Sequence, residues 1–210
     1  MSRRIDYYFS LTSPWAYIGH RLFADLARRH GAQIVYRPVA LTEVFAETGG
    51  LPLAKRHPAR QAYRMVELKR WREKRGLAFH LKPKHWPFDP GLADRVILAI
   101  VSVGGDPGLF AQMAFIAIWE QEQNLADPAT LTRLLRDGGY DADAILSRAE
   151  QPDIRRAYEQ NRLAAVEAGV FGSPSYVLDG EVFWGQDRLD LLEDALKSGR
   201  SAYSAEAAQR

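Results

Sequence analysis

The first side chain that could do chemistry is Ser13, in the stretch SLTSPWAYIGH that covers residues 10–20. An apolar and aromatic run, IDYYFS, precedes it, and Pro14 follows at the position where a new helix favours proline. The pattern predicts a strand that turns directly into a helix, with Ser13 as the N-cap. The free N–H groups and the dipole at a helix start stabilise an anion. Ser13 is therefore either a helix cap alone or a donor to a bound anion.

Two stretches near the end of the chain also place polar groups at turns. Ser173 and Pro174 lie in FGSPSYV, where the proline is a candidate for a cis peptide bond, the alternative being an ordinary strand-entry proline. Gln186 and Asp187 lie in WGQDRL, and Asp187 is predicted to cap a last helix over residues 187–199. Such a helix start can bind a carboxylate, and Gln186 or Asp187 an ammonium group. The alternative is a plain capping pair.

The 210-residue chain contains no cysteine, which excludes disulfides, thiolate metal sites and dithiol redox chemistry by the protein itself. A net charge of +2 suits a small anionic ligand and does not call for nucleic acid. The longest apolar run, residues 96–103, is too short to span a membrane, and the N-terminus lacks the apolar stretch of a signal peptide. We therefore expect a cytoplasmic protein that binds neither nucleic acid nor membrane.

The elements that must position these residues follow the order β-α-β, a long helical block, then β-β-α. Strands are predicted at 5–10 and 33–41 around a helix from Pro14 to Gly31, and residues 42–58 are loop-like. Helices follow at 59–76, 91–103, 107–121, 128–137, 141–149 and 152–168. A hairpin over 173–185 turns at Asp179-Gly180, and the tail from Arg200 is expected to be disordered.

This order predicts an α/β, thioredoxin-like fold with a helical domain inserted between the βαβ and ββα halves. Residues 1–43 and 169–210 would form the discontinuous thioredoxin-like domain, and residues 44–168 the insertion. In this topology the corner after the first strand holds the reactive group, because the helix start stabilises a thiolate there. The redox proteins place C-x-x-C at this corner, whereas this chain has Ser13-Pro14-Trp15-Ala16. A thiol of another molecule can use the same anion site, and glutathione is the obvious intracellular candidate.

Three other features have competing interpretations. His80 and His85 are interpreted as loop histidines rather than metal ligands, because no cysteine or carboxylate pair accompanies them. The helix from Arg60 to Arg75 is very basic, apolar at Tyr63, Val66 and Trp71, and indicates a solvated face or an anion-attracting rim rather than a nucleic-acid site. Trp15, His85 and Trp86 are candidates for the wall of a substrate pocket, the alternative for the 85–88 segment being a small satellite core.

With these motifs in place, the chain resembles the 2-hydroxychromene-2-carboxylate isomerases, relatives of kappa-class glutathione transferases and of DsbA-type oxidoreductases. The resemblance covers residues 5–198 and rests on the motifs S-P-W-x-Y-x-G, F-G-x-P and W-G-x-D-R-L. The stretches YRMVELKRW and GLAFHLKPKHWP match between them.

The resemblance implies a glutathione-dependent isomerase that acts as a homodimer on a small aromatic or conjugated acid. In that family the thiolate adds to the conjugated substrate, rotation follows about the new single bond, and the thiolate is eliminated. The product of 2-hydroxychromene-2-carboxylate is then trans-o-hydroxybenzylidenepyruvate. The implied glutathione contacts are Ser13, against the sulfur, with Pro14, Ser173, Pro174, Gln186 and Asp187.

Two positions depart from the family pattern. Many members have a small polar residue where this chain has Gln186, and the family's ligand-contacting asparagine has no clean counterpart in the 49–60 loop. Lys55 and Arg56 are the candidates for that role. Two other functions stay open: a kappa-like glutathione transferase or peroxidase that consumes glutathione, and a glutathione-binding protein without catalysis.

Overall fold

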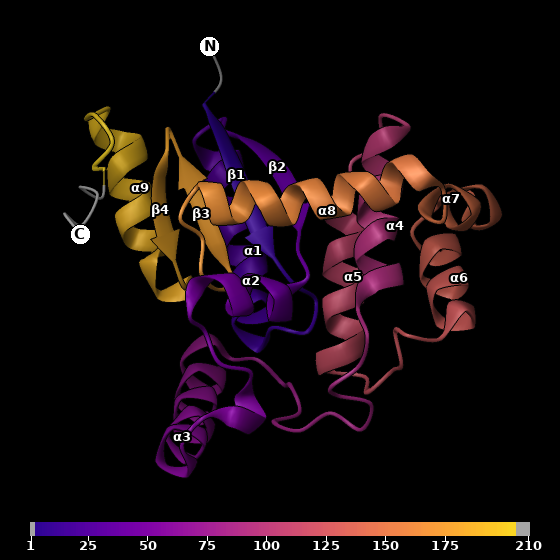
Figure 1. Ribbon diagram of the computed structural model, residues 1–210, viewed down its shortest axis with the longest axis horizontal. Coiled ribbons are helices and arrows are strands. Elements are labelled where there is room, and N and C mark those ends of the chain that lie inside the picture. Colours follow the sequence, from indigo (N-terminus) through magenta and orange to yellow (C-terminus); the bar gives the residue numbers. More distant parts are fainter. Residues whose placement is uncertain (1–2, 205–210) are drawn as a thin grey trace.

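A four-stranded mixed sheet lies at the centre of the computed structural model, which describes residues 3–204 (Figure 1). The strand order is β2-β1-β3-β4. β1 pairs in parallel with β2, whereas β3 pairs antiparallel with both β1 and β4. Their bounds are β1 Arg4–Phe9, β2 Gln33–Pro38, β3 Ser175–Leu178 and β4 Glu181–Trp184. Both ends of the chain therefore build one sheet, as the sequence predicted.

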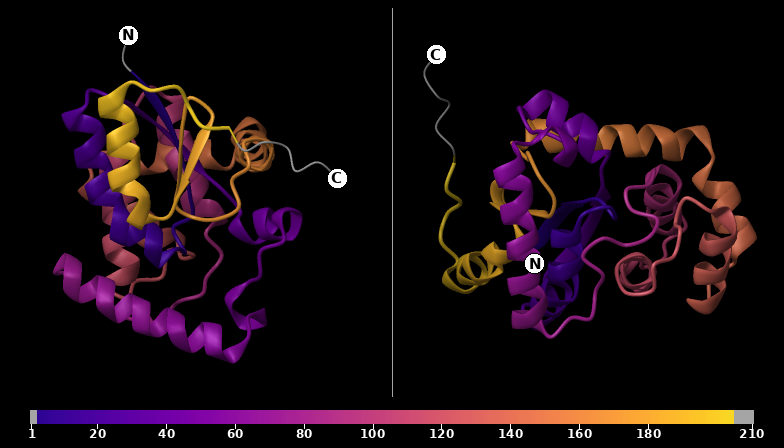
Figure 2. Two further views of the ribbon diagram at one scale, coloured as in Figure 1. Left: turned by 90° about the vertical axis from the view of Figure 1, so that its left-hand side faces the viewer. Right: turned by 90° about the horizontal axis from the view of Figure 1, so that it is seen from below.

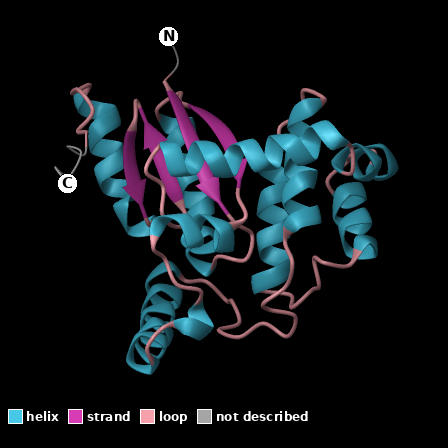
Figure 3. Ribbon diagram, viewed as in Figure 1, coloured by secondary structure: helices cyan, strands magenta, loops and turns pink. Residues whose placement is uncertain are grey.

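Helices surround the sheet and extend to one side of it (Figure 3). α8 crosses in front of the sheet in Figure 1, α4 to α7 gather at the right, and α3 lies below, at the end where β1 runs into α1. Figure 2 shows α3 as an arm beneath the sheet. The bounds are α1 Pro14–Arg29, α2 Leu41–Thr48, α3 Pro58–Arg75, α4 Gly91–Ser102, α5 Gly108–Trp119, α6 Pro128–Asp137, α7 Ala142–Ala149, α8 Pro152–Glu167 and α9 Leu189–Ser198. Two 3₁₀ turns, η1 Leu53–Lys55 and η2 Gln186–Arg188, complete the order.

The alternation of β1 divides the core between the two faces of the sheet. Tyr7 and Phe9 are fully buried on one face, in a cluster that also contains buried residues of α1, α4, α5 and α9. Tyr8 points to the other face, where it joins Val44 of α2 and Ala165 of α8. Successive side chains of a strand point to opposite faces, so an apolar run such as IDYYF requires a layer of helices on each side. The main cluster runs from β1 into α4 and α5; the domain boundaries at 43 and 169 stay a prediction.

The fold confirms the thioredoxin-like α/β class and the hairpin turn, in which Asp179 and Gly180 both have positive φ. The loop-like interpretation of residues 42–58 is wrong in its first part, because α2 occupies Leu41–Thr48 and ends at Gly49, which adopts the left-handed conformation. Val44 buries this short helix against the layer that contains α8.

The expected disorder of the tail is wrong for its first residues. Arg200 donates to both carboxylate oxygens of Glu181, and Tyr203 N–H donates to the same carboxylate. A bidentate guanidinium–carboxylate pair fixes this segment against β4. Residues 205–210 lie outside the described part of the chain.

Within residues 3–204, no helix is both long and apolar enough to cross a membrane. Nor do three or more histidine, aspartate or glutamate side chains gather in a metal-binding group within this part of the chain.

Asp94 of α4 is a fully buried carboxyl group that helps to anchor the β1–α1 corner. Burial raises the pKa of Asp94 to about 8, and the Tyr158 hydroxyl and the Leu11 backbone oppose this shift. Tyr158 donates to Oδ2 at 2.8 Å, while Oδ1 has no hydrogen-bond partner among residues 3–204. Asp94 therefore stays protonated in the folded protein over a range of pH in which the same carboxyl group is ionised in the unfolded chain.

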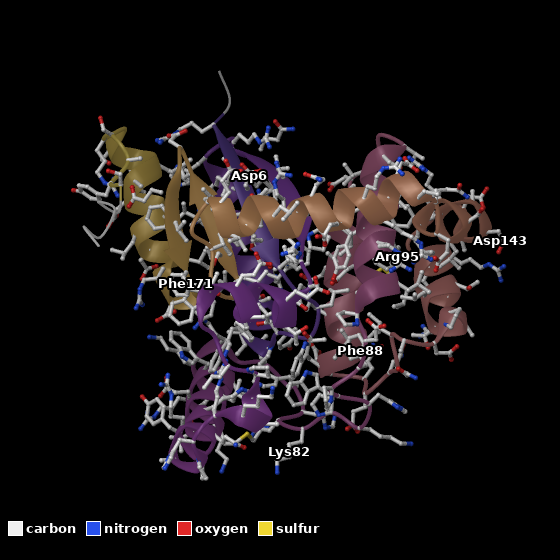
Figure 4. All side chains as sticks on the ribbon, viewed as in Figure 1. Asp6, Lys82, Phe88, Arg95, Asp143 and Phe171 are labelled. Atoms are coloured by element: carbon white, nitrogen blue, oxygen red, sulfur yellow. The ribbon has the colours of Figure 1, made fainter. Side chains whose placement is uncertain are left out.

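We expect the folded protein to become less stable as the pH rises, because its Asp94 keeps a proton that the unfolded chain releases. Between the ordinary pKa of 3.8 and the folded value of about 8, only the folded state holds the proton. The free energy of unfolding should therefore fall from about pH 4 to about pH 8, by at most about 1.4 kcal/mol per pH unit. Urea unfolding of wild type and Asp94→Asn at several pH values measures this, and the variant should lose that part of the slope. Asp143→Asn is the control, because the Asp143 side chain is 85% exposed (Figure 4). Equal slopes in wild type and Asp94→Asn would contradict the assignment.

Candidate functional site

Ser13 occupies the corner between β1 and α1, as predicted. It is the N-cap of α1, with Pro14 in the first turn, and its Oγ accepts a hydrogen bond from Ala16 N–H at 3.2 Å. The same hydroxyl donates to the carbonyl of Ser173 at 3.0 Å. Ser13 is only 4% exposed. The hydroxyl is therefore a cap that also joins the first and last thirds of the chain at one point.

Two backbone N–H groups at this corner have no acceptor within residues 3–204: those of Trp15 and Ser173. Pro14 has no N–H, Ala16 donates to Ser13 Oγ, and Tyr17 N–H donates to the Ser13 carbonyl. A free N–H in the first turn of a helix points away from the helix toward its N-terminal side. The corner therefore offers unused donors next to a buried hydroxyl, an arrangement that stabilises an anion.

The Ser173–Pro174 peptide bond is cis, the first of the two alternatives that FGSP left open. Ser10 N–H donates to Ser173 Oγ at 3.0 Å, and Gly185 N–H donates to the Pro174 carbonyl at 2.9 Å. These two hydrogen bonds fix Ser173 to the end of β1 and Pro174 to the end of β4. The main chain of Ser173 consequently lies beside Ser13, while its own N–H stays unused.

Gln186 and Asp187 lie in η2, and the prediction that Asp187 caps the last helix is wrong. Gly185, with φ of 102°, leads into this 3₁₀ turn, and α9 begins only at Leu189 without a side-chain cap. Asp187 is exposed and pairs with Arg188 at 2.5 Å. The extra turn explains the difference, because it follows Gly185 directly and moves the N-cap of α9 from the predicted Asp187 to Arg188.

The Gln186 side chain is turned inward and is 2% exposed. Its Oε1 accepts a hydrogen bond from Nη2 of Arg75, at the end of α3, at 3.2 Å. A Cβ placed on Gly19 would lie 2.6 Å from Gln186 Cβ and 3.0 Å from the Tyr176 hydroxyl, so only glycine fits there. The Tyr176 hydroxyl and Arg75 Nε are both buried, and neither has a hydrogen-bond partner in the part of the chain that the structure describes. Burial raises the pKa of Tyr176, which keeps the phenol neutral.

Trp86, one of the residues of the predicted pocket wall, contacts the corner from the loop between α3 and α4. Its indole N–H donates to the carbonyl of Thr12 at 2.9 Å, and its ring lies 6.1 Å from that of Trp119. Trp15 is half-buried, whereas His85 is exposed. Phe88, labelled in Figure 4, is half-buried against the main core and follows a cis Trp86–Pro87 bond.

The two candidates for the missing asparagine differ in their surroundings. Lys55 is exposed at the end of η1. Arg56 is half-buried, donates from Nε to the Leu51 carbonyl at 2.7 Å, and lies over the ring of Phe45. The side chain of Arg56 is thus held in place, while that of Lys55 forms no hydrogen bond or ion pair with another side chain or carbonyl group of residues 3–204.

Arg64 and Arg75 of α3 are site features that the sequence did not single out. Arg75 binds Gln186, and Arg64 packs on the ring of Trp86 at 5.4 Å. The helix is basic throughout, so composition does not separate these two arginines from their solvated neighbours. The usable signal in the sequence is spacing along the helix. Arg64 lies four residues before the buried Leu68, and Arg75 lies four residues after the half-buried Trp71.

The corner, the cis-proline segment and the η2 turn together define a class of protein. The DSBA-like thioredoxin domain matches residues 4–197, which is nearly the whole chain. This protein therefore belongs to the DsbA-like thioredoxin family.

Within that class the similarity is more specific. A 2-hydroxychromene-2-carboxylate isomerase of Sphingobium xenophagum is 32% identical over 198 residues, covering 93% of this chain and 99% of the relative. The protein of the same name from Pseudomonas putida is 27% identical over 196 residues, covering 91% of this chain and 93% of the relative. These matches place the chain in the 2-hydroxychromene-2-carboxylate isomerase family and confirm the resemblance that the motifs indicated. Glutathione S-transferase kappa 1 of Caenorhabditis elegans is 25% identical, covering 92% of this chain and 91% of the relative.

Solved structures agree on the fold. A 2-hydroxychromene-2-carboxylate isomerase superposes with a TM-score of 0.81 at 23% identity, over 93% of this chain and 95% of the other. The cytosolic disulfide reductase DsbM from Pseudomonas aeruginosa, in a structure with GSH, gives a TM-score of 0.69 at 17% identity, over 93% and 98% of the two chains.

Proposed function

We propose that the protein is a glutathione-dependent isomerase of 2-hydroxychromene-2-carboxylate or a related conjugated aromatic acid. The observation that carries the proposal is the buried Ser13 hydroxyl, held between Ala16 N–H and the Ser173 carbonyl in a chain without cysteine. A thiolate-binding corner without its own sulfur needs a thiol from outside. The names of the relatives, isomerases and a kappa-class glutathione transferase, support this choice.

The residues present fit glutathione. Two backbone donors, the N–H groups of Trp15 and Ser173, have no acceptor within the described chain and lie at the corner. The Ser173 carbonyl can accept from a peptide N–H of the ligand once the Ser13 hydroxyl turns away from it. Asp187 offers an exposed carboxylate for an ammonium group. Gln186 faces Arg75 instead, so its proposed part is to fix the η2 turn and present backbone to the ligand.

The chemistry that glutathione supplies when bound is reversible addition of its thiolate to the conjugated double bond, which permits rotation and ends with elimination of the same thiolate. Ser13 would donate its hydroxyl hydrogen to the sulfur, with Trp15 N–H as the second donor, and would hold the thiolate charge away from water. Trp86, fixed by Thr12, would form one wall for the aromatic ring. Pro14 starts α1 directly after the Ser13 cap. Because proline has no N–H, it leaves no unpaired donor of its own in the first turn.

The test of this function is the fate of glutathione during turnover. We expect 2-hydroxychromene-2-carboxylate to be converted only when glutathione is added, and the free thiol measured afterwards to equal the amount supplied. A stoichiometric loss of thiol would instead identify a kappa-like transferase or peroxidase. Calorimetric titration comes first: no heat and no rise in Tm with millimolar glutathione would overturn the proposal and leave a protein that does not use glutathione.

The location and assembly belong to the same proposal. The cytoplasm is the proposed compartment, because glutathione maintains a reducing pool of thiols there. A homodimer is proposed from the resemblance to the family, and size-exclusion chromatography with light scattering tests it.

A further inference from the structure

Arg64 is half-buried, and its guanidinium has no carboxylate partner within residues 3–204. It lies on α3, its guanidinium carbon is 5.4 Å from the centre of the Trp86 ring, and Nη1 reaches the sulfur of Met65 at 3.9 Å. Within residues 3–204 the Arg64 guanidinium forms no ion pair and no hydrogen bond to a carbonyl group, only these two contacts. Its Nε and Nη2 are not sealed from solvent, so their N–H groups stay available to a ligand.

Burial next to another cation makes this arrangement costly for the apoprotein. Burial, and then the charge of Arg56, lowers the pKa of Arg64 to about 10. Burial, and then Arg60, lowers the pKa of Arg56 as well. Both side chains stay charged at neutral pH. The acidic residue nearest in sequence, Glu67, pairs with Arg70 instead. Two partly desolvated guanidinium groups thus lie together, and no carboxylate in the described part of the chain neutralises them.

The indole of Trp86 connects Arg64 to the corner. One face of that ring carries Arg64, while its N–H donates to the carbonyl of Thr12, the residue before Ser13. The loop that holds Trp86 and the helix that holds Arg64 therefore meet at the thiolate-binding corner. Arg60, one turn earlier on α3, is exposed and has no such contact.

We propose that Arg64, assisted by Arg56, binds a carboxylate of the ligand at this corner and thereby selects conjugated acids. The inference deepens the proposed function and rests on it for the identity of the acid. A planar guanidinium binds a carboxylate through two parallel hydrogen bonds, and stacking on an indole holds its plane fixed. Two sources of the carboxylate share this chemistry: the aromatic acid itself and the glycyl end of glutathione.

The first test uses simple ligands and requires no turnover. Calorimetric titration compares cinnamate, an aromatic conjugated acid, with cinnamamide, its uncharged equivalent. We expect wild type to bind cinnamate about 10- to 100-fold more tightly than cinnamamide, as for a hydrogen-bonded charge pair. Arg64→Met, which keeps an apolar stem on Trp86, should abolish this preference. Arg64→Lys should keep part of it, and Arg60→Met should leave it unchanged.

The second test separates the sources. Glutathione and γ-glutamylcysteine, which lacks the glycyl residue, are titrated into wild type and Arg64→Met. A loss confined to glutathione identifies the glycyl carboxylate, and a loss confined to cinnamate identifies the acid substrate. Unchanged binding of both cinnamate and glutathione in a folded Arg64→Met variant, with Tm as the check, overturns the inference. Failure of wild type to turn over 2-hydroxychromene-2-carboxylate would contradict the proposed function, while the binding result for Arg64 would still stand.

Discussion

Replacing Ser13 with alanine is expected to lower kcat/KM by roughly 10- to 150-fold, because about 1.5–3 kcal/mol of hydrogen bonding to the anionic sulfur is lost. The fold should survive. Ser13 also caps α1 through Ala16 N–H, so the free energy of unfolding should fall by about 0.5–2 kcal/mol. Steady-state kinetics with saturating and limiting glutathione, together with urea unfolding, measure both effects. A change in kcat would locate the loss in the reaction itself rather than in the first binding step.

A matched cap separates the two roles of Ser13. Asp127 precedes a proline and caps α6 through Ala129 N–H at 3.0 Å, as Ser13 does for α1. Asp127→Ala should lower stability by a similar amount and leave kcat/KM unchanged. If Ser13→Ala turns over at the wild-type rate, Ser13 is a structural cap and its catalytic assignment is wrong.

Replacing Gly19 with alanine is expected to have the second large effect, in the direction opposite to helix propensity. Alanine normally stabilises a helix interior by about 1 kcal/mol relative to glycine. Here the added Cβ would lie 2.6 Å from Gln186 Cβ and 3.0 Å from the Tyr176 hydroxyl, both buried. Overpacking of this kind costs about 1–3 kcal/mol. Because the displaced group is the η2 turn, glutathione binding should weaken together with the Tm.

Gly91 provides the control for Gly19. It is also helical, but a Cβ there would meet only the carboxylate end of Asp89 at 3.1 Å and the guanidinium end of Arg95 at 3.3 Å. Those flexible side chains can move, so Gly91→Ala should leave the Tm and glutathione binding nearly unchanged. Thermal unfolding and calorimetry of both variants decide the matter. If Gly19→Ala has the same Tm as Gly91→Ala, the η2 turn moves aside without loss of stability and the prediction is wrong.

The features that the sequence predicted well are those set by neighbouring residues. Ser13-Pro14 specifies a cap and a first helical residue, and Asp179-Gly180 specifies a two-residue hairpin turn, because backbone conformation there depends on the local side chains. The nearly continuous apolar run IDYYF likewise indicates a strand that is buried on both faces. These local signals, taken in order along the chain, were enough to predict the sheet and its topology class.

The features that the sequence did not predict depend on contacts between distant segments. The α2 helix is short and has a single buried residue, Val44, so its pattern is too brief to stand out from a loop. Asp187 looks like a cap by sequence, but Gly185 diverts the chain into a 3₁₀ turn first. The inward position of Gln186 depends on Arg75, which is more than a hundred residues away. No local pattern carries that information.

The protonation state of glutathione in the bound complex distinguishes a thiolate-binding corner from a simple helix cap. The ultraviolet absorbance of the thiolate, followed against pH at saturating protein, gives the pKa of the bound thiol. We expect a pKa well below the value of about 8.5 for a free thiol, and a return toward that value in Ser13→Ala. Bound glutathione whose thiol titrates as it does free in solution, in both wild type and Ser13→Ala, would contradict the assignment of this corner.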